Sequence, residues 1–171
     1  PENVEDWTIS LINTGLLNMT GSRVKQIEPY IDGDVFFLCY GDGLANVNLK
    51  ELLAFHRSHG KIATITGVHP PSRFGELVVR DSKVIQFEEK PQTHTGCING
   101  GFFVFDKRVF KYLNHDEQCI LERGPLESLT QDGELMVYVH KDFWQCMDTL
   151  RDTNLLNSLW NSGNAPWKIW S

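Results

Sequence analysis

This chain of 171 residues lacks a Lys/Arg-rich block, an apolar run long enough to cross a bilayer, and a Cys-x-x-Cys pair. The formal net charge is −6, and an acidic chain without a basic block is not expected to bind nucleic acid or an anionic membrane surface. Neither a signal peptide nor a membrane span is recognisable, so we expect a cytoplasmic protein.

The spacing of the histidines and cysteines does not indicate a metal site or a set of disulfides. His56 and His59 stand three residues apart on an expected helix, but no further ligand cluster lies near them. We therefore expect a solvated helix face there rather than a metal site. The cysteines are isolated from one another, and we expect reduced structural thiols rather than disulfides or zinc ligands. They are Cys39, Cys97, Cys119 and Cys146.

The composition is that of a globular protein, with 41% hydrophobic and 22% charged residues. The length suffices for one domain with a core. The chain begins at Pro1 without an initiator Met, so we expect either a trimmed protein or part of a longer one.

Apolar periodicity predicts strands that alternate with helices before a hairpin interrupts the pattern. This order predicts an α/β protein with a mixed, mostly parallel sheet, helices on both faces and an inserted hairpin. Expected strands are residues 7–13, 35–40, 62–68, 98–105 and 134–140, with a hairpin of 77–79 and 84–87. Expected helices are residues 49–59, 107–113, 122–131 and 150–160, preceded by a helix that opens at Thr20-Gly21-Ser22 and has an apolar stripe of Val24, Ile27 and Ile31. The aromatic tail at 165–170 is expected to dock on the body.

The first candidate site residue is Asp42, in Tyr-Gly-Asp-Gly directly after the apolar strand 35–40. The unbroken apolar run predicts a strand buried on both faces, and ligands of open α/β sheets bind at the carboxyl ends of such strands. A carboxylate there can hold Mg²⁺, which in turn holds phosphate. The alternative is a polar turn whose Asp caps its own backbone.

A second candidate loop spans residues 13–23. It contains glycine and opens a helix that Thr20 or Ser22 can cap, so its N–H groups are suited to an anion or a base. Arg23 is suited to a phosphate contact. An ordinary capped helix is the competing interpretation.

Two further segments carry polar groups near strand ends. Lys90, held extended by Pro91, is suited to act as a point charge for phosphate, unless Glu88, Glu89 and Lys90 form only a solvated cluster. Asn99 precedes Gly100 and Gly101, whose lack of side chains suits either a close ligand or a bulge. Asp148, before the last helix, is either a helix-terminal acid or a second carboxylate for a cation shared with Asp42.

Taken in order, these motifs resemble the sugar-nucleotide pyrophosphorylases, in particular their glucose-1-phosphate cytidylyltransferase branch. The resemblance covers nearly the whole chain. It is carried by Asn-Thr-Gly with Met-Thr-Gly-Ser-Arg (13–23), Tyr-Gly-Asp-Gly (40–43), Pro-x-x-Arg-Phe-Gly (70–75), Phe-Glu-Glu-Lys-Pro (87–91), Ile-Asn-Gly-Gly-Phe-Phe-Val (98–104) and Phe-Trp-Gln-x-Met-Asp-Thr-Leu-Arg-Asp (143–152).

The resemblance implies transfer of a nucleotidyl group from CTP to glucose 1-phosphate, giving CDP-glucose and pyrophosphate, with Mg²⁺ held by Asp42 and Asp148. It implies that Lys90 contacts the sugar phosphate, that Glu89 and Asn99 face sugar hydroxyls, and that Gly41 and Gly100 also bind substrate. The residues implied near the nucleotide are Asn18, Met19, Thr20 and Arg23.

Three departures from the family pattern stand out. Asn13 and Ser22 replace the usual Asp and Gly, and these 171 residues contain no Gly-rich Leu-Ala-Gly-Gly-x-Gly-Thr-Arg loop with its catalytic Lys. We therefore expect the C-terminal two-thirds of an enzyme, inactive alone, with residues 1–69 the remainder of the nucleotide part and 70–171 the sugar-phosphate part. We further expect a homo-oligomer or pairing with an N-terminal segment. The alternatives are a non-catalytic sugar-phosphate or nucleotide-binding module and an assembly domain that uses the aromatic tail.

Overall fold

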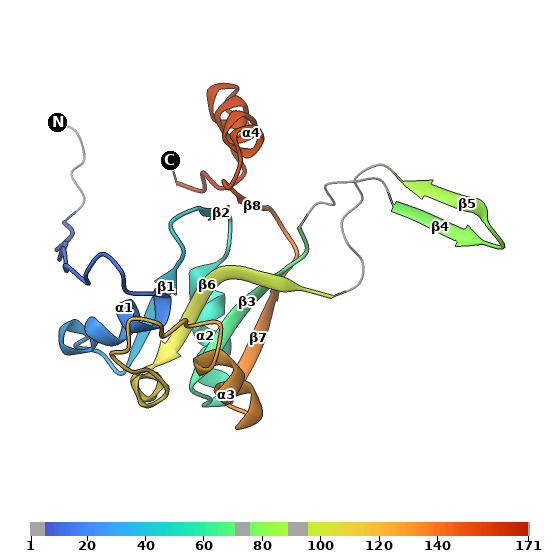
Figure 1. The fold of residues 1–171 in the computed structure, drawn as a ribbon. Coiled ribbons are helices and arrows are strands. Elements are labelled where there is room, and N and C mark those ends of the chain that lie inside the picture. The colour runs from blue at the N-terminus through green and yellow to red at the C-terminus, as the bar shows by residue number, and fades with distance from the viewer. Residues whose placement is uncertain (1–5, 71–75, 89–95, 171) are drawn as a thin grey trace.

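In a computed structural model, the structure describes residues 6–70, 76–88 and 96–170, and Figure 1 shows their arrangement. The helices are α1 (Thr20–Gln26), η1 (Glu28–Tyr30), α2 (Leu49–His59), η2 (Lys107–Tyr112), α3 (Pro125–Gln131) and α4 (Leu150–Asn161). The strands are β1 (Val35–Cys39), β2 (Gly43–Ala45), β3 (Ala63–Val68), β4 (Glu76–Arg80), β5 (Lys83–Glu88), β6 (Ile98–Asp106), β7 (Leu135–His140) and β8 (Trp144–Cys146).

The central sheet has four strands in the order β1-β6-β3-β7. Strand β6 runs antiparallel to both β1 and β3, while β3 and β7 are parallel. Three strands therefore share one direction, as expected of a mixed and mostly parallel sheet, but the insertion of β6 makes two of the three pairings antiparallel. Small antiparallel pairs of β2 with β8 and of β4 with β5 complete the described strands.

Helices cover the sheet on both faces, as the sequence predicted. Because side chains alternate along a strand, β6 sends Phe103 and Phe105 into one core cluster and Val104 into the other. All three side chains are fully buried. The first cluster packs under α1, η2 and α3, and the second under α2.

Strand β1 was expected to be buried on both faces, and this expectation is wrong within the described residues. Phe37 is 45% exposed, and Cys39 is also exposed. The reason is position, because β1 lies at one end of the described sheet whereas β6 lies inside it. The continuous apolar run of β1 indicates a hydrophobic strand, but it does not indicate how many strands lie beside it.

Residues 7–13 were predicted to form a strand, but none forms there. Their apolar side chains remain exposed, with Trp7 at 74%, Ile9 at 72% and Leu11 at 92%. A strand needs a partner for its backbone groups, and the alternation of residues 7–13 finds no partner among the described residues. Helix α1 is shorter than expected because a separate 3-10 turn, Glu28–Tyr30, follows it with Pro29 in its first positions.

Helix α2 follows its sequence signals closely. The Asn48 side chain accepts hydrogen bonds from Lys50 N and Glu51 N, which satisfies two of the orphan donors of the first turn. The helix ends at Gly60 in the left-handed conformation, with φ of 65°. Among the described residues, no helix is both long and apolar enough to cross a membrane.

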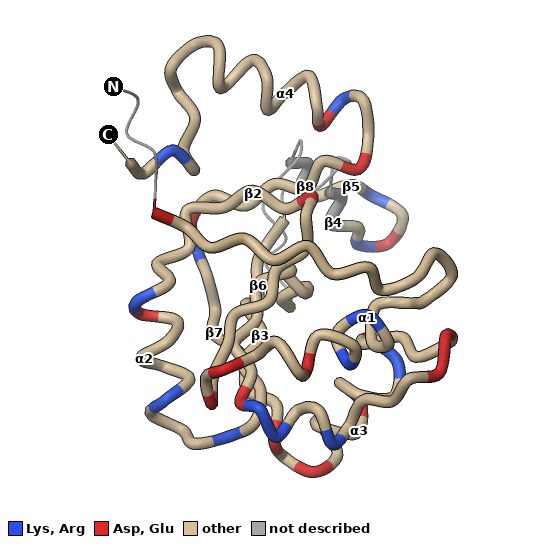
Figure 2. The backbone as a smooth tube through the Cα atoms, turned by 90° about the vertical axis from the view of Figure 1, so that its left-hand side faces the viewer, with Lys and Arg blue, Asp and Glu red and all other residues tan. Residues whose placement is uncertain are grey.

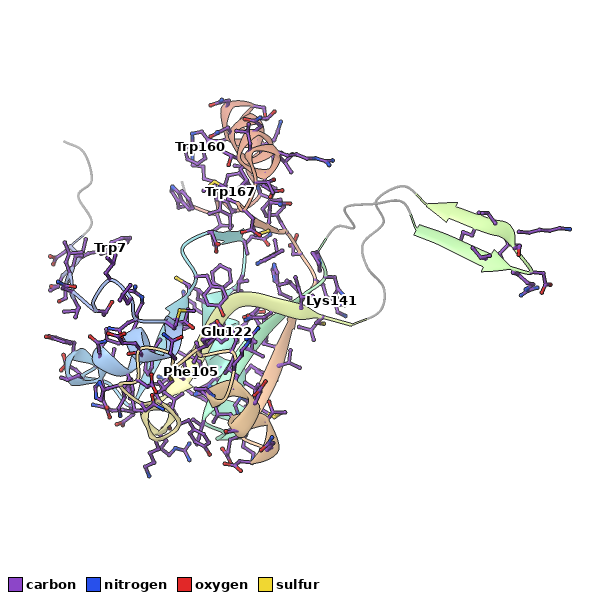
Figure 3. The ribbon with its side chains drawn as sticks, in the orientation of Figure 1. Trp7, Phe105, Glu122, Lys141, Trp160 and Trp167 are labelled. Atoms are coloured by element: carbon purple, nitrogen blue, oxygen red, sulfur yellow. The ribbon has the colours of Figure 1, made fainter. Side chains whose placement is uncertain are left out.

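The C-terminal tail docks in part. Trp167 is 9% exposed and its ring lies 5.5 Å from that of Phe143, so this part of the tail is packed as expected. Trp170 remains 57% exposed. Figure 3 shows Trp167 between α4 and the body, and Figure 2 shows that charged residues of α4 are confined to its first turn.

Candidate active site

The carboxyl edge of the sheet gathers most of the predicted site residues. Asp42 follows β1, and Asn99 and Gly100 stand near the start of β6, which runs the opposite way and so begins at the same edge. Strand β7 ends at this edge, and the chain then continues into β8 and Asp148. Strand direction therefore explains how segments far apart in sequence reach one place.

An open pocket of about 590 Å³ lies beside Asp42. Its walls come from the end of β1, the first residue of α1 and the segment before α3. The lining residues are Thr20, Cys39, Tyr40, Gly41, Asp42 and Glu122. Three of the predicted site residues, Thr20, Gly41 and Asp42, thus line one pocket.

The turns that carry Asp42 and Asp148 are joined by backbone pairing. Gly43 pairs with Cys146, and Met147 N–H donates to the carbonyl oxygen of Asp42 at 2.9 Å. Both aspartates are exposed. Two carboxylates suit Mg²⁺, which takes one or two protein carboxylates and fills its other positions with water and substrate phosphate. In the described part of the chain, no cluster of three or more His, Cys, Asp or Glu residues is placed to hold a metal.

Loop 13–23 is held by its own hydrogen bonds. Arg23 donates to Thr14 Oγ1 at 2.7 Å and to the carbonyl oxygen of Leu16 at 3.2 Å. Asn18 donates to the carbonyl oxygen of Thr14 and accepts from the hydroxyl of the fully buried Ser22 at 3.2 Å. Arg23 and Ser22 therefore shape the loop that carries Asn18.

The predicted helix cap at Thr20 or Ser22 is wrong. Met19 holds the N-cap position without a side-chain cap, and it is 39% exposed. The N–H groups of Gly21 and Ser22 both donate to the carbonyl oxygen of Cys119, at 2.9 and 3.1 Å. These donors of the first turn are satisfied by the segment before α3, so the Thr20 hydroxyl does not serve as the helix cap.

The Thr20 hydroxyl belongs to a network centred on Glu122. It accepts from Leu121 N–H at 2.9 Å and donates to Glu122 Oε2 at 2.9 Å. The Tyr40 hydroxyl donates to Glu122 Oε1 and accepts from Asn99 Nδ2 at 3.1 Å. Burial, reinforced by the hydrogen bond to the Glu122 carboxylate, raises the pKa of Tyr40, so its hydroxyl stays protonated at neutral pH.

The glycines after Asn99 form the bulge that the sequence left open as an alternative. The register of β3 against β6 shifts between Ile65 and Gly67. Gly101 has φ of +77°, and a Cβ on it would lie 2.7 Å from the ring of Tyr40. The bulge thus lets Tyr40 pack closely on β6, and Trp144 Nε1 donates to the carbonyl oxygen of Gly100 at 2.8 Å.

Glu89 and Lys90 lie outside the described residues. Three contributors to the pocket were not predicted as site residues, namely Cys39, Glu122 and the side chain of Tyr40. Glu122 stands in an ordinary polar segment 102 positions from Thr20 and 82 from Tyr40. Nothing local marks it, whereas Tyr40 adjoined a recognised motif.

The histidines of α2 do not form the solvated face that was expected. His56 is 3% exposed, and Thr64 Oγ1 lies 2.9 Å from His56 Nδ1 and 2.8 Å from His59 Nε2. Burial lowers the pKa of both imidazoles, so both rings stay neutral at physiological pH. The buried His56 and the half-buried His59 thus join α2 to β3 through Thr64.

Together, these features define a mixed α/β protein with an open pocket at the carboxyl edge of its sheet. Residues 17–164 match the family model described as Nucleotidyl transferase. The chain is 45% identical to glucose-1-phosphate cytidylyltransferase of Salmonella typhimurium over 99% of its own length. It is 30% identical to mannose-1-phosphate guanylyltransferase catalytic subunit beta of Dictyostelium discoideum over 71% of its length. The chain belongs to the nucleotidyl transferase family.

The matched region is only part of these relatives. The chain spans 66% of the Salmonella protein and 35% of the Dictyostelium protein. Among solved structures, HddC from Yersinia pseudotuberculosis superposes with a TM-score of 0.62 and 23% identity, covering 85% of this chain and 63% of HddC. This structural likeness shows the shared fold.

Proposed function

We propose that this chain forms part of an enzyme that transfers a nucleotidyl group from CTP to α-D-glucose 1-phosphate, releasing pyrophosphate and CDP-glucose. The observation that carries the proposal is the 45% identity to a named glucose-1-phosphate cytidylyltransferase along 99% of the chain, against 30% along 71% for the guanylyltransferase. The pocket beside Asp42 supports it, because its polar lining suits a phosphorylated sugar and a cation.

In this proposal Asp42 and Asp148 hold Mg²⁺, which would neutralise phosphate charge when bound. Their paired turns and oxygen donors fit this role. Lys90 contacts the phosphate of the sugar. The sugar phosphate is already an anionic nucleophile, so the residues of the chain need to position and neutralise rather than abstract a proton.

The remaining site residues divide between the two substrates. Glu89 and Asn99 are assigned to the sugar hydroxyls, and Gly41 and Gly100 are also assigned to substrate binding. The residues assigned to the nucleotide are Asn18, Met19, Thr20 and Arg23. This division follows the proposed parts of the chain, residues 1–69 for the nucleotide and 70–171 for the sugar phosphate, in an enzyme acting in the cytoplasm.

The test is CDP-glucose formation from CTP, glucose 1-phosphate and MgCl₂, followed by anion-exchange chromatography. We expect product from the full-length protein and none from the 171-residue chain, because these residues contain no Gly-rich triphosphate loop. Product from the short chain would contradict the expected inactivity. Equal rates with GTP or UTP would contradict the choice of CTP.

The alternative is a binding module without catalysis. It predicts that the full-length protein binds glucose 1-phosphate or CTP but forms no CDP-glucose under the same conditions. Isothermal titration with each ligand, run beside the product assay, separates this outcome from a protein that binds neither ligand.

A further inference from the structure

Glu122 stands where two chains of hydrogen bonds meet. One chain runs from Leu121 N–H through the Thr20 hydroxyl to Glu122 Oε2. The other runs from Gly101 N–H to Asn99 Oδ1 at 2.9 Å, and from Asn99 Nδ2 through the Tyr40 hydroxyl to Glu122 Oε1. The network therefore follows the pocket lining from Thr20 through Glu122 to Tyr40, and it links this lining to Asn99 near the start of β6.

The direction of these hydrogen bonds is set at their outer ends. A backbone N–H can only donate, so Leu121 N–H makes the Thr20 oxygen an acceptor and leaves the Thr20 proton for Glu122. Gly101 N–H likewise makes Asn99 Oδ1 an acceptor and directs Asn99 Nδ2 to the Tyr40 oxygen. The Tyr40 proton then goes to Glu122, whose carboxylate accepts from both sides.

We propose that Glu122 is a positioning residue that holds Thr20 and Asn99 in a fixed relation across the pocket. This inference rests on the proposed function, which assigns Thr20 to the nucleotide and Asn99 to the sugar. By spanning both, Glu122 pre-organises the two substrate subsites relative to each other. Pre-organisation strengthens binding because the ligand does not have to order these side chains itself.

Positioning predicts a specific order among variants at residue 122. Glu122→Ala removes both hydrogen bonds and releases Thr20 and Tyr40. Glu122→Gln keeps both the length of the side chain and its two contacts. Its oxygen accepts from Tyr40, and its amide donates to the Thr20 oxygen, which has a second lone pair. If the negative charge itself contacted substrate, the Gln variant would fail like the Ala variant.

The first measurement needs no ligand. In ¹H–¹⁵N spectra of the full-length protein, we expect the Asn99 side-chain amide signal to move in Glu122→Ala and to stay near its place in Glu122→Gln. Glu117→Ala, an exposed glutamate in the preceding turn, is the matched control and leaves the signal unchanged. Should Glu122→Ala fail to fold, Tyr40→Phe breaks the same link and is expected to move the same signal.

The second measurement is isothermal titration with glucose 1-phosphate. We expect Glu122→Ala to weaken binding about tenfold, in line with loss of hydrogen bonds to a charged group, and Glu122→Gln to stay within about threefold of the wild type. An unmoved Asn99 signal in both Glu122→Ala and Tyr40→Phe overturns the proposal, as does equal sugar-phosphate binding by Glu122→Ala and wild type. If the wild type binds no glucose 1-phosphate while the Asn99 signal moves, the substrate assignment fails and the positioning role stands.

Discussion

The backbone N–H of Met147 donates to the carbonyl oxygen of Asp42 at 2.9 Å. This contact continues the pairing of β2 with β8 by one step, so the turn containing Asp42 and the turn containing Asp148 share one backbone frame. Two carboxylates more than a hundred positions apart in the chain are thereby carried by one small ladder.

The shared frame predicts a cation site that needs both carboxylates. With Mn²⁺ as an oxygen-seeking probe for the Mg²⁺ site, we expect selective broadening of the Gly43 and Met147 amide signals. Asp42→Asn or Asp148→Asn should weaken Mn²⁺ binding, measured by this broadening, about tenfold or more, since each removes a charged oxygen ligand. Asp32→Asn, an exposed carboxylate in another turn, is the control. Broadening that survives in Asp148→Asn would place the cation on Asp42 alone.

The His56–Thr64–His59 cluster predicts acid-sensitive stability. The pKa of each imidazole is lowered in the folded state, so the unfolded chain binds protons more readily. The free energy of unfolding should therefore be maximal with respect to these groups above about pH 6.5, the ordinary pKa of His, and fall as the pH drops below it. His59, Asp106, Arg108 and Arg57 act on His56, while Lys61 and Glu134 act on His59.

A pair of threonines on one strand tests this cluster. Thr64→Val removes the hydroxyl shared by the two rings and should cost about 1–3 kcal/mol at pH 7.5. Thr66→Val, two positions along, is the matched control. Thr66 is also fully buried, but its hydroxyl has no partner among the described residues, so its removal should be neutral or stabilising. Urea unfolding from pH 5 to 8 measures both, and equal losses would show that Thr64 is not special.

The partial docking of the tail predicts that its two tryptophans contribute unequally to stability. Trp167→Ala removes a buried ring that packs at a tilt against Phe143 and should destabilise the chain by about 3–5 kcal/mol. Trp170→Ala removes a ring that is 57% exposed and should change stability by less than about 0.5 kcal/mol. Denaturant unfolding followed by circular dichroism is the measurement. Similar effects of the two substitutions would mean that the tail is docked through another contact.

Lys90 lies outside the described residues, so its proposed role is a prediction from the family resemblance. In the full-length protein, Lys90→Ala should raise KM for glucose 1-phosphate about tenfold or more while changing KM for CTP far less. The expected loss is that of a charge-assisted hydrogen bond, about 1.5–3 kcal/mol. Lys83→Ala, an exposed lysine in the hairpin, provides the control. Equal changes for both substrates would show that Lys90 is not assigned to the correct ligand.

The apolar edge of β1 predicts association. Strand β1 lies at one end of the described sheet with Phe37 45% exposed, and unpaired apolar edges promote contact with other chains. We expect the purified 171-residue chain to dimerise, to require an N-terminal segment, or to be poorly soluble. Light scattering should give a mass above 19.6 kDa, and Phe37→Lys should reduce it. Val137→Lys, on β7 at the other end, is the control, and a stable wild-type monomer would contradict the prediction.

Local signals in the sequence determined most elements. The Asn48 cap and Gly60 stop bound α2, and Asp42 falls directly after β1 at the expected carboxyl end of the strand. These features depend on a few neighbouring residues and on elementary backbone preferences, so they can be read without knowing the fold. The alternation at residues 7–13 misled because a strand requires a partner, which local sequence does not specify.

Only the tertiary structure decided what meets across the pocket. Glu122 carries no local motif, yet it joins Thr20 to Tyr40 and Asn99 because sheet topology brings three remote segments together. Burial likewise turned His56 from an expected solvent-facing residue into a neutral ring bonded to Thr64. Strand order and packing set these contacts, and both depend on interactions between residues far apart in the chain. Local periodicity and motif spacing do not specify such interactions.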